Sequence, residues 1–467
     1  MTESKDILIT GGTVLTGVAT DPAQPGADVL ILDGRIAAIG PDLAATGIVP
    51  AGTEVIDAAG SVVMPGFVDT HRHTWQAIVR NIASDWSLDE YMAGLHVGLS
   101  RHFRPEDTYV SNYLGALEAL DSGITTLVDW SHNLRTTEHA DAAVKALEDT
   151  GMRAVFAHGG GAAQWGGEMP SPVEHPRDDA TRLRTEHFAS NDGLVTMALA
   201  LRGPQFTTRE VNRADFALAR DLDLRVTVHV GDGHWGKMRP IIMLQEDGLL
   251  SDTITYVHCT TLSDEELRII AATGGSASVA PDVEAQMGHG YPATGRLLAA
   301  GVRPSFSIDV CSSNGGDMFG TMRTAIGLQR AADNKELVDA GVIIERIGLG
   351  CADVIQFATL DGANAAGLGG QTGSLEVGKK ADVIVVSGNS LAMSPLNNPF
   401  GGIVYNAHPG LVTDVIVDGV VRKRDGRLVG VDVKKLRDEA AEARDYILSQ
   451  MPAASVDGAW HPEVAHA

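Results

Sequence analysis

The chain has 467 residues, of which 44% are hydrophobic and 21% are charged, a balance that is typical of folded globular proteins. Its 36 Lys and Arg residues are outnumbered by 60 Asp and Glu residues, so the formal net charge is -24. Because phosphate backbones and anionic lipid surfaces are bound by clustered cations, this charge argues against nucleic-acid and membrane partners.

The small number of cysteines and the lack of long apolar runs indicate where in the cell the protein is expected. Only three cysteines occur, Cys259, Cys311 and Cys351, and no C-x-x-C pair is present, so neither a disulfide framework nor a thiolate zinc cluster is predicted. The segment from Met1 to Ile7 is polar, and no run of eighteen or more apolar residues follows. We therefore expect a cytoplasmic protein.

Both ends of the chain have the pattern of short β-strands. Apolar runs broken by Gly, Pro and Asp extend from Asp6 to Val63, and the same pattern occurs again after Ala381. Both regions contain D-G pairs, which are typical of hairpin turns. This predicts a small β-sandwich domain built from both termini, with its parts at residues 1–64 and 373–432. An amphipathic helix is expected from Val433 to Met451, within a final segment at 433–467.

The middle section alternates buried apolar runs with amphipathic segments of helix length, such as Glu138 to Asp149 and Glu210 to Asp221. Strands are expected to begin near Val62, Thr125, Arg153, Leu194, Arg225, Thr253, Ser276 and Arg303. This pattern predicts the α/β fold class, with a (β/α)8 TIM barrel over residues 65–372. An open doubly wound sheet is the alternative, but no G-x-G-x-x-G follows the first strand to favour it.

Polar residues with metal-binding chemistry stand where the predicted strands end. His71 and His73 close the first strand, and residues two apart in a strand point to the same side. His229, His258 and Asp309 close three other strands, and the active face of a TIM barrel is formed at these strand ends. Imidazoles with one carboxylate and no thiolate are a usual ligand set for a catalytic divalent metal.

Four segments together resemble the amidohydrolase superfamily, in the branch of cytosine deaminase and the triazine hydrolases. They are P-G-F-V-D-T-H-R-H-T-W-Q, T-V-H-V-G-D, Y-V-H-C-T-T-L and S-I-D-V-C-S-S-N, and the likeness extends over nearly the whole chain. The resemblance implies that His71, His73, His229 and Asp309 bind one divalent metal, zinc by preference, with cobalt, iron or manganese as alternatives. It also implies a homo-oligomer, either a dimer or a tetramer.

The resemblance also implies catalytic roles. A bound metal lowers the pKa of water from 15.7 to about 7, which provides hydroxide near neutral pH. We expect Asp309 to take the water proton and His258 to stabilise the oxyanion. Deaminases of this branch usually carry His-x-x-Glu after the fifth strand, whereas Asp232 takes the place of the glutamate here. Since aspartate is one methylene shorter, this change argues against deamination of an aromatic base.

A further set of polar and aromatic residues is predicted to contact the substrate. The main candidates are Trp75, Gln76, His132 and Glu284, with Trp130, His158, Trp235, Asp282 and His289 as additional ones. Aromatic walls with few charges suit a small and mostly apolar molecule.

The preferred prediction is a mononuclear metal-dependent hydrolase that cleaves a C-N bond, or a neighbouring C-S or C-O bond, in an amide, urea or (thio)carbamate. One alternative is a deaminase or dechlorinase of a purine, pyrimidine or triazine ring. A second alternative, from another class, is an interaction protein that keeps the amidohydrolase fold without catalysis.

Overall fold

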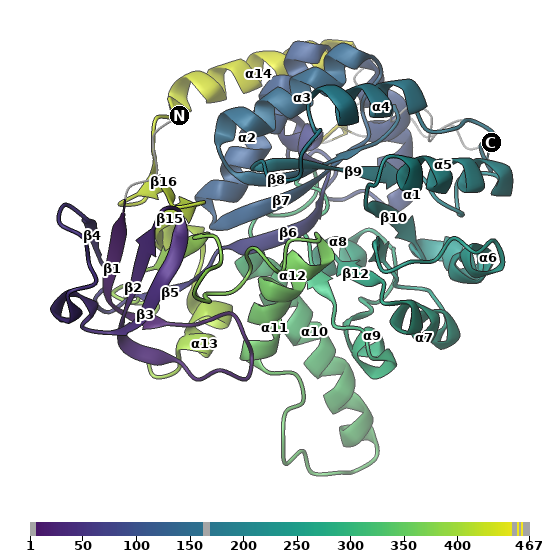
Figure 1. Cartoon of the computed structure of the whole chain (residues 1–467). Coiled ribbons are helices and arrows are strands. Elements are labelled where there is room, and N and C mark those ends of the chain that lie inside the picture. Colours follow the sequence, from purple (N-terminus) through teal and green to yellow (C-terminus); the bar gives the residue numbers. More distant parts are fainter. Residues whose placement is uncertain (1–5, 162–168, 451–454, 457–458, 461–467) are drawn as a thin grey trace.

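The computed structural model describes residues 6–161 and 169–450, and two short strands, β18 (Ser455–Val456) and β19 (Ala459–Trp460). Figure 1 shows a barrel of parallel strands surrounded by helices, with a second sheet at one side. The second sheet combines purple strands from the start of the chain with yellow-green strands from its end. The two predicted parts of the fold are therefore both present.

Eight parallel strands form the barrel sheet in consecutive order. They are β6 (Phe67–Arg72), β7 (Ile124–Ser131), β8 (Arg153–His158), β9 (Val195–Leu201), β10 (Val226–Val230), β11 (Ile254–His258), β12 (Ser276–Val279) and β13 (Ser305–Phe306). The sheet closes where the amide of His73 donates to the carbonyl of Asp309 (2.8 Å) and the amide of Asp309 donates to the carbonyl of His71 (2.9 Å). The α/β fold class and the TIM barrel are thereby confirmed.

Helices occupy the connections between these strands and also follow the last of them, β13. They are α1 (Leu88–Tyr91), α2 (Pro105–Asp121), α3 (Thr137–Thr150), α4 (Arg177–Glu186), α5 (Arg209–Asp221), α6 (Pro240–Glu246), α7 (Asp264–Thr273), α8 (Pro281–Gln286), α9 (Thr294–Ala300), α10 (Met318–Asp339), α11 (Cys351–Phe357) and α12 (Leu360–Ala365). The helices expected around Glu138 and Glu210 correspond to α3 and α5. In α7, Ser263 and Glu266 cap the first turn reciprocally, and Gly274, with φ 74°, ends the helix.

The terminal strands form one mixed sheet of nine strands. They are β1 (Ile7–Val14), β2 (Gln24–Leu32), β3 (Arg35–Pro41), β4 (Glu54–Asp57), β5 (Val62–Pro65), β14 (Val383–Val386), β15 (Val412–Val417), β16 (Val420–Arg424) and β17 (Arg427–Leu428). The antiparallel pair of β5 and β14 joins the two ends of the chain. Asp33 and Gly34 both have positive φ, as the tight turn of the β2–β3 hairpin requires.

The strand expected to open the barrel near Val62 is divided between the two sheets, which corrects that prediction. Val62–Pro65 pairs with β14 in the terminal sheet, and the barrel strand begins only at Phe67. The crossing point is Gly66, where a Cβ atom would lie 2.1 Å from the side chain of Thr125. Both halves of the segment are buried, so the apolar pattern contains no sign of the division.

The last long helix, α14 (Val433–Ser449), lies along α2 at the top of Figure 1. It buries Leu436, Ala440, Ala443 and Ile447. The helix was expected to reach Met451, which lies outside the described residues. The remaining short helices are α13 (Pro399–Gly401), the 3-10 helices η1 (Leu43–Thr46), η2 (Thr74–Val79), η4 (Leu99–His102), η6 (Gly233–Met238) and η8 (Pro409–Leu411), and the π-helices η3 (Met92–Gly98) and η7 (Gly402–Asn406).

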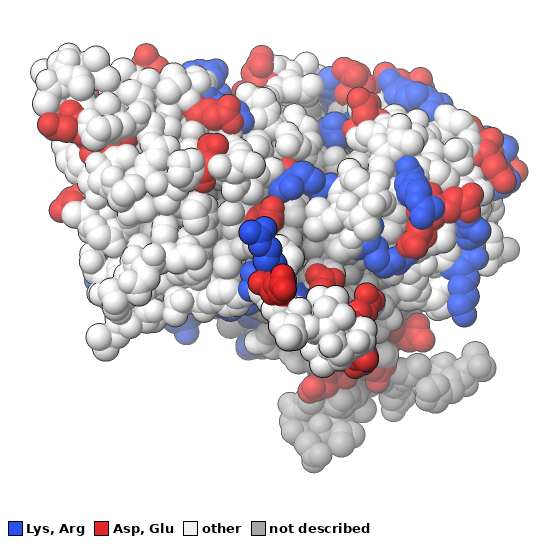
Figure 2. Space-filling view, turned by 90° about the horizontal axis from the view of Figure 1, so that it is seen from below, with Lys and Arg blue, Asp and Glu red and all other residues white. Residues whose placement is uncertain are grey.

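The surface seen from below carries charges of both signs. Figure 2 shows Lys and Arg side chains interspersed with Asp and Glu over this face. The acidic excess of the chain therefore does not form a single patch there. Across residues 6–161 and 169–450, the helices are too short or too polar to cross a membrane.

Candidate active site

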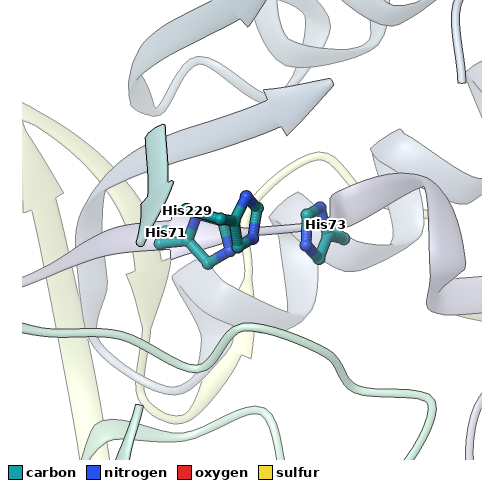
Figure 3. Close-up of side chains that lie close together, drawn as sticks. All are labelled: His71, His73 and His229. Carbon is teal, nitrogen blue, oxygen red and sulfur yellow. The ribbon is translucent and has the colours of Figure 1, made fainter. Parts of the chain in front are cut away.

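Three histidines converge at the carboxyl end of the barrel. His71 lies in β6, His73 directly follows β6, and His229 lies in β10, and Figure 3 shows the three imidazoles close together. The ring of His71 lies 4.7 Å from that of His73 and 4.8 Å from that of His229, measured between centroids. One ring nitrogen from each histidine lies within 4.8 Å of the other two, which is close enough to bind a common cation.

Asp309 adds a carboxylate to the same cluster. Its Oδ1 atom lies 3.2 Å from Nε2 of His71 and 3.3 Å from Nε2 of His73. Asp309 has a φ of 62°, a left-handed conformation that is uncommon outside glycine and that concentrates at functional sites. The structure thus brings together all four residues that the sequence predicts as metal ligands.

The protonation states of this cluster suit a divalent cation. Burial lowers the pKa of His73 and of His229 well below the ordinary value, so both rings are neutral. Burial raises the pKa of Asp309, but hydrogen bonding and charge interaction with His71 and its neighbours lower it further, so the carboxylate is ionised. Nδ1 of His73 lies 3.2 Å from the carbonyl oxygen of Trp130, an arrangement that directs Nε2 into the cluster. Three neutral imidazoles and one carboxylate fit a catalytic metal.

His258 lies beside this cluster at the end of β11, also with positive φ (74°). Its Nε2 is 3.7 Å from Oδ2 of Asp309, and its Nδ1 is 3.1 Å from Oε1 of Glu284. Burial lowers the pKa of His258, but the hydrogen bond with Glu284 and the charge of Asp309 outweigh it and raise the pKa to about 9. His258 is therefore held as a proton donor that faces the ligands.

A cavity opens over these residues. Its walls are mostly apolar, and they include both metal-site and loop residues: His73, Leu88, Tyr91, Met92, His96, Phe206, His229, Asp232, Trp235, His258, Met287, His289, Asp309 and Val310. Asp232 lies in this wall, and its Oδ1 accepts a hydrogen bond from the side-chain amide of Gln205 (2.6 Å). The predicted catalytic residues His258, Asp309 and Asp232 therefore share one cavity.

The predicted substrate contacts Trp75, Gln76, His132 and Glu284 are not among the described residues that line this cavity. Trp75 and Gln76 belong to η2, whose residues Thr74–Val79 are all buried, because the chain turns away from the barrel mouth immediately after His73. Gln76 donates to the hydroxyl of Tyr91 (2.6 Å), and Trp75 donates to His132 (3.4 Å). Their influence on a substrate would pass through residues in front of them, such as Tyr91.

Of the additional candidates, Trp235 and His289 line the cavity, whereas His158 and Asp282 have other partners. His158 contacts His175 (2.9 Å) and Asp179 (3.1 Å), and Asp282 accepts a hydrogen bond from Thr321 (3.0 Å). Trp130 packs against the ring of His229, with 4.5 Å between ring centroids, behind the metal-binding cluster.

The sequence did not identify the segment from Leu88 to His96 as part of the site. It forms α1 and the start of η3 and supplies four cavity residues. The pattern Ser87-x-x-Glu90 is a signal for a helix start, and the structure contains this reciprocal cap. That signal marks the beginning of a helix but does not indicate which loop folds across the barrel mouth.

Arg72, which stands between the two histidines, points to the opposite side of β6. It is fully buried and pairs with Asp69 (2.8 Å), and it donates to the carbonyl of Gly316 (2.8 Å). Asp69 in turn accepts from the amide of Ile308, the residue before Asp309 (3.1 Å). This ion pair links β6 to the segment that carries Asp309.

Comparisons with known proteins give consistent matches. The model of the amidohydrolase family matches residues 62–422. The chain is 30% identical over 460 residues to a 5-methylthioadenosine/S-adenosylhomocysteine deaminase of Syntrophobacter fumaroxidans, covering 95% of this chain and 97% of that one. It is 29% identical over 451 residues to a 5'-deoxyadenosine deaminase of Methanothermobacter thermautotrophicus, covering 94% and 98%.

Solved structures match over similar lengths. An adenosine deaminase from Xanthomonas campestris with bound zinc has a TM-score of 0.82 and 26% identity, and the match covers 96% of this chain and 99% of that one. An atrazine chlorohydrolase from Arthrobacter aurescens complexed with zinc has a TM-score of 0.79 and 24% identity, with 94% and 100% covered. This second likeness concerns the fold alone.

Proposed function

As a member of the amidohydrolase family, the chain is a hydrolase that acts on carbon–nitrogen bonds, and we propose that it removes an amino group from an uncharged aromatic ring that contains nitrogen. This is the first alternative from the sequence rather than the preferred amide, urea or (thio)carbamate. The deaminases among the relatives support the change, and so does the position of Asp232.

The observation that carries this proposal is a second carboxylate in the cavity wall. Asp309 lies among the histidines, whereas Asp232 belongs to neither group of described residues that could hold a metal and accepts a hydrogen bond from Gln205. When water adds to a ring carbon, electrons move to the adjacent ring nitrogen, which must take up a proton. Such a reaction uses one acid-base group at the water and another at the ring, whereas hydrolysis of an acyclic amide does not need the second one.

The shorter side chain of Asp232 does not prevent this role. The preceding residue, Gly231, has a φ of 70°, and its amide donates to the side-chain oxygen of Gln205. The amide nitrogen of the same Gln205 side chain holds Asp232. This fixed turn brings the backbone to the cavity, so the carboxylate forms part of the wall without the extra methylene of a glutamate.

The mechanism follows from these positions. A divalent metal held by His71, His73, His229 and Asp309 would supply an acidified water. The ionised Asp309 accepts a proton from the attacking water, and His258, oriented by Glu284, donates a hydrogen bond to the oxygen that is added. Asp232 donates a proton to the ring nitrogen and regains one from the added hydroxyl as the carbonyl forms, while Asp309 passes the water proton to the leaving amino group, which departs as ammonia when the C–N bond breaks. Overall, the ring amine and water give the ring hydroxyl, or its keto tautomer, and ammonia.

Zinc is the metal that we propose, because the similar adenosine deaminase structure contains it and the ligand set suits it. Cobalt, iron and manganese accept the same ligands. Elemental analysis of the purified protein is expected to give about one zinc per chain.

A substrate panel tests the reaction class. Adenosine, 5'-deoxyadenosine, 5'-methylthioadenosine, cytosine and an amino-substituted triazine would be assayed for ammonia, and a phenylurea and a thiocarbamate for amine or thiol. Ammonia release from at least one ring is expected. Turnover of the acyclic compounds alone would instead support the amide, urea or (thio)carbamate reaction.

Replacing Asp232 by asparagine tests its proton transfer. We expect kcat to fall by about 100- to 10,000-fold, the usual contribution of a general acid-base group, with the zinc content unchanged. Asp232→Glu should retain part of the activity. The matched control is Asp282→Asn, a carboxylate bonded to Thr321 outside the cavity, which should keep kcat. A kcat within about threefold of wild type in Asp232→Asn would exclude the role.

A further inference from the structure

His289 is a buried histidine whose ring has no hydrogen-bond partner among the residues that the structure describes. It lies in the cavity wall, is 4% exposed, and neither of its ring nitrogens bonds to any residue of the described ranges. An unpaired polar group in a protein interior costs free energy, so native structures seldom keep one without a purpose. Because this ring borders the cavity, a bound molecule can supply the missing partner.

The backbone holds His289 firmly in place. Its carbonyl oxygen accepts from the amide of Gly233 (2.7 Å) and from the hydroxyl of Thr260 (2.7 Å). The residues on either side, Gly288 and Gly290, have φ values of 88° and 126°, which side-chain-bearing residues rarely adopt. The segment is therefore shaped to present this side chain, and a fixed partner loses little entropy when a ligand binds.

The chemistry of the ring suits a neutral contact. It packs edge-on against His258, with 4.6 Å between ring centroids. Burial lowers the pKa of His289 to about 3, and a neutral imidazole has one hydrogen-bond donor and one acceptor. The two groups of described residues that could hold a metal are His71, His73 and His229, and His71, His258 and Asp309, so His289 belongs to neither.

His289 is linked to the second carboxylate through the backbone. The amide that donates to the His289 carbonyl belongs to Gly233, the residue after Asp232. Two neighbouring loops thus place two polar groups in a wall that is otherwise mostly apolar. A planar ring that offers its nitrogen to Asp232 can present another edge atom to His289.

We propose that His289 is a specificity-determining residue that forms a hydrogen bond with a second polar edge atom of the substrate ring, distinct from the amino group that leaves. This inference rests on the proposed deamination and narrows its substrate class. The substrate has a further ring nitrogen or carbonyl, and it is not an anion, because Asp232 and Asp309 repel negative charge and none of the described residues in the wall is Lys or Arg. An analogue in which CH replaces that ring nitrogen or carbonyl would be a poor substrate.

The test replaces His289 by phenylalanine, which keeps a ring but removes both polar atoms. With the best substrate of the panel, we expect KM to rise by about 10- to 100-fold and to change more than kcat, because the lost contact stabilises bound substrate throughout the reaction. His289→Asn, which keeps a donor and an acceptor, should recover part of the loss. Zinc content should stay at the wild-type level in both variants.

His139 provides a matched control. It is equally buried, but Thr136 (2.9 Å) and the carbonyl of Phe103 (3.1 Å) already occupy its nitrogens, outside the cavity. His139→Phe is therefore expected to lower stability and to leave KM unchanged. If His289→Phe folds poorly, His289→Ala makes the same comparison without placing a larger ring in the wall.

Three results would overturn the proposal: an unchanged KM in both His289→Phe and His289→Ala, loss of zinc on either substitution, or a fall in kcat alone. Failure of the deamination proposal is distinguishable from these. Turnover of only the phenylurea or thiocarbamate would reject deamination, and the KM comparison would then be made with that compound. An unchanged KM with a ring substrate that releases ammonia would reject only the role of His289.

Discussion

Asp309→Ala is expected to remove the metal and to reduce turnover by at least about 1,000-fold, equivalent to about 4 kcal/mol of transition-state stabilisation. The carboxylate contacts His71 and His73 and lies near the proton donor His258. Its loss removes both a ligand and the base that accepts the water proton. Catalytic metal sites have few ligands and therefore tolerate the loss of one poorly. Zinc analysis and kcat measurement would be made on the same preparation.

Comparing Asp309→Ala with Asp232→Asn separates the loss of the metal from the loss of a proton-transferring group. Both substitutions change a buried carboxylate in the same cavity, but only Asp309 belongs to the metal-binding cluster. Zinc should therefore be lost in the first variant and kept in the second. An Asp309→Ala protein with full zinc content and wild-type kcat would contradict the ligand assignment and the mechanism that depends on it.

Asp382→Ala is expected to lower the free energy of unfolding by about 3–5 kcal/mol, because it leaves the buried charge of Arg153 with only a 3.3 Å contact to the partly exposed Asp418. Arg153 begins β8 of the barrel, and Asp382 precedes β14 of the terminal sheet. Their side chains form two contacts, of 2.7 and 3.1 Å, and both residues are at most 3% exposed. Asp382 also accepts from Thr372 and from the amide of Asp418. Urea denaturation would measure the change.

The pair of Arg153 and Asp382 also makes the stability of the folded protein depend on pH. Burial raises the pKa of Asp382, but Arg153 and the other donors lower it to below the ordinary value of 3.8. Because the pKa of Asp382 is lower in the folded protein than in the unfolded chain, its ionised carboxylate stabilises the fold at any pH above the unfolded-state pKa. This stabilisation is lost as the pH falls through the lower, folded-state pKa.

Asp438→Ala is the control for Asp382→Ala, because the pair of Asp438 with Lys434 is exposed and contributes less than about 0.5 kcal/mol. Equal effects of the two substitutions would refute the role of the buried pair.

The barrel and its metal-binding cluster were predictable because each depends on local rules. Strand starts were located within two residues at seven of the eight barrel strands, since buried strands have continuous apolar runs. His71 lies in β6 and His73 directly follows it, and residues two apart in an extended segment point to the same side. The ends of parallel strands then bring in His229 and Asp309.

The substrate-contacting wall was not predictable, because it depends on how loops fold over the barrel mouth. Gln76 follows the metal-binding motif closely, yet the turn into η2 buries it behind Tyr91. Asp232 was judged too short on the basis of side-chain length, whereas the backbone turn at Gly231 determines where its carboxylate lies. In both cases the direction of the backbone decides where the side chain lies, and residue spacing does not predict that direction.

The pairing of β5 with β14 has a consequence for synthesis of the chain. While the ribosome is still making the barrel, β5 can pair with β1 on one side, but its other edge stays unpaired because Val383–Val386 has not yet been translated. An unpaired strand edge can associate with other chains. Newly made protein is therefore most exposed to aggregation before its last fifth emerges, and a truncation ahead of β14 would make that vulnerable state permanent.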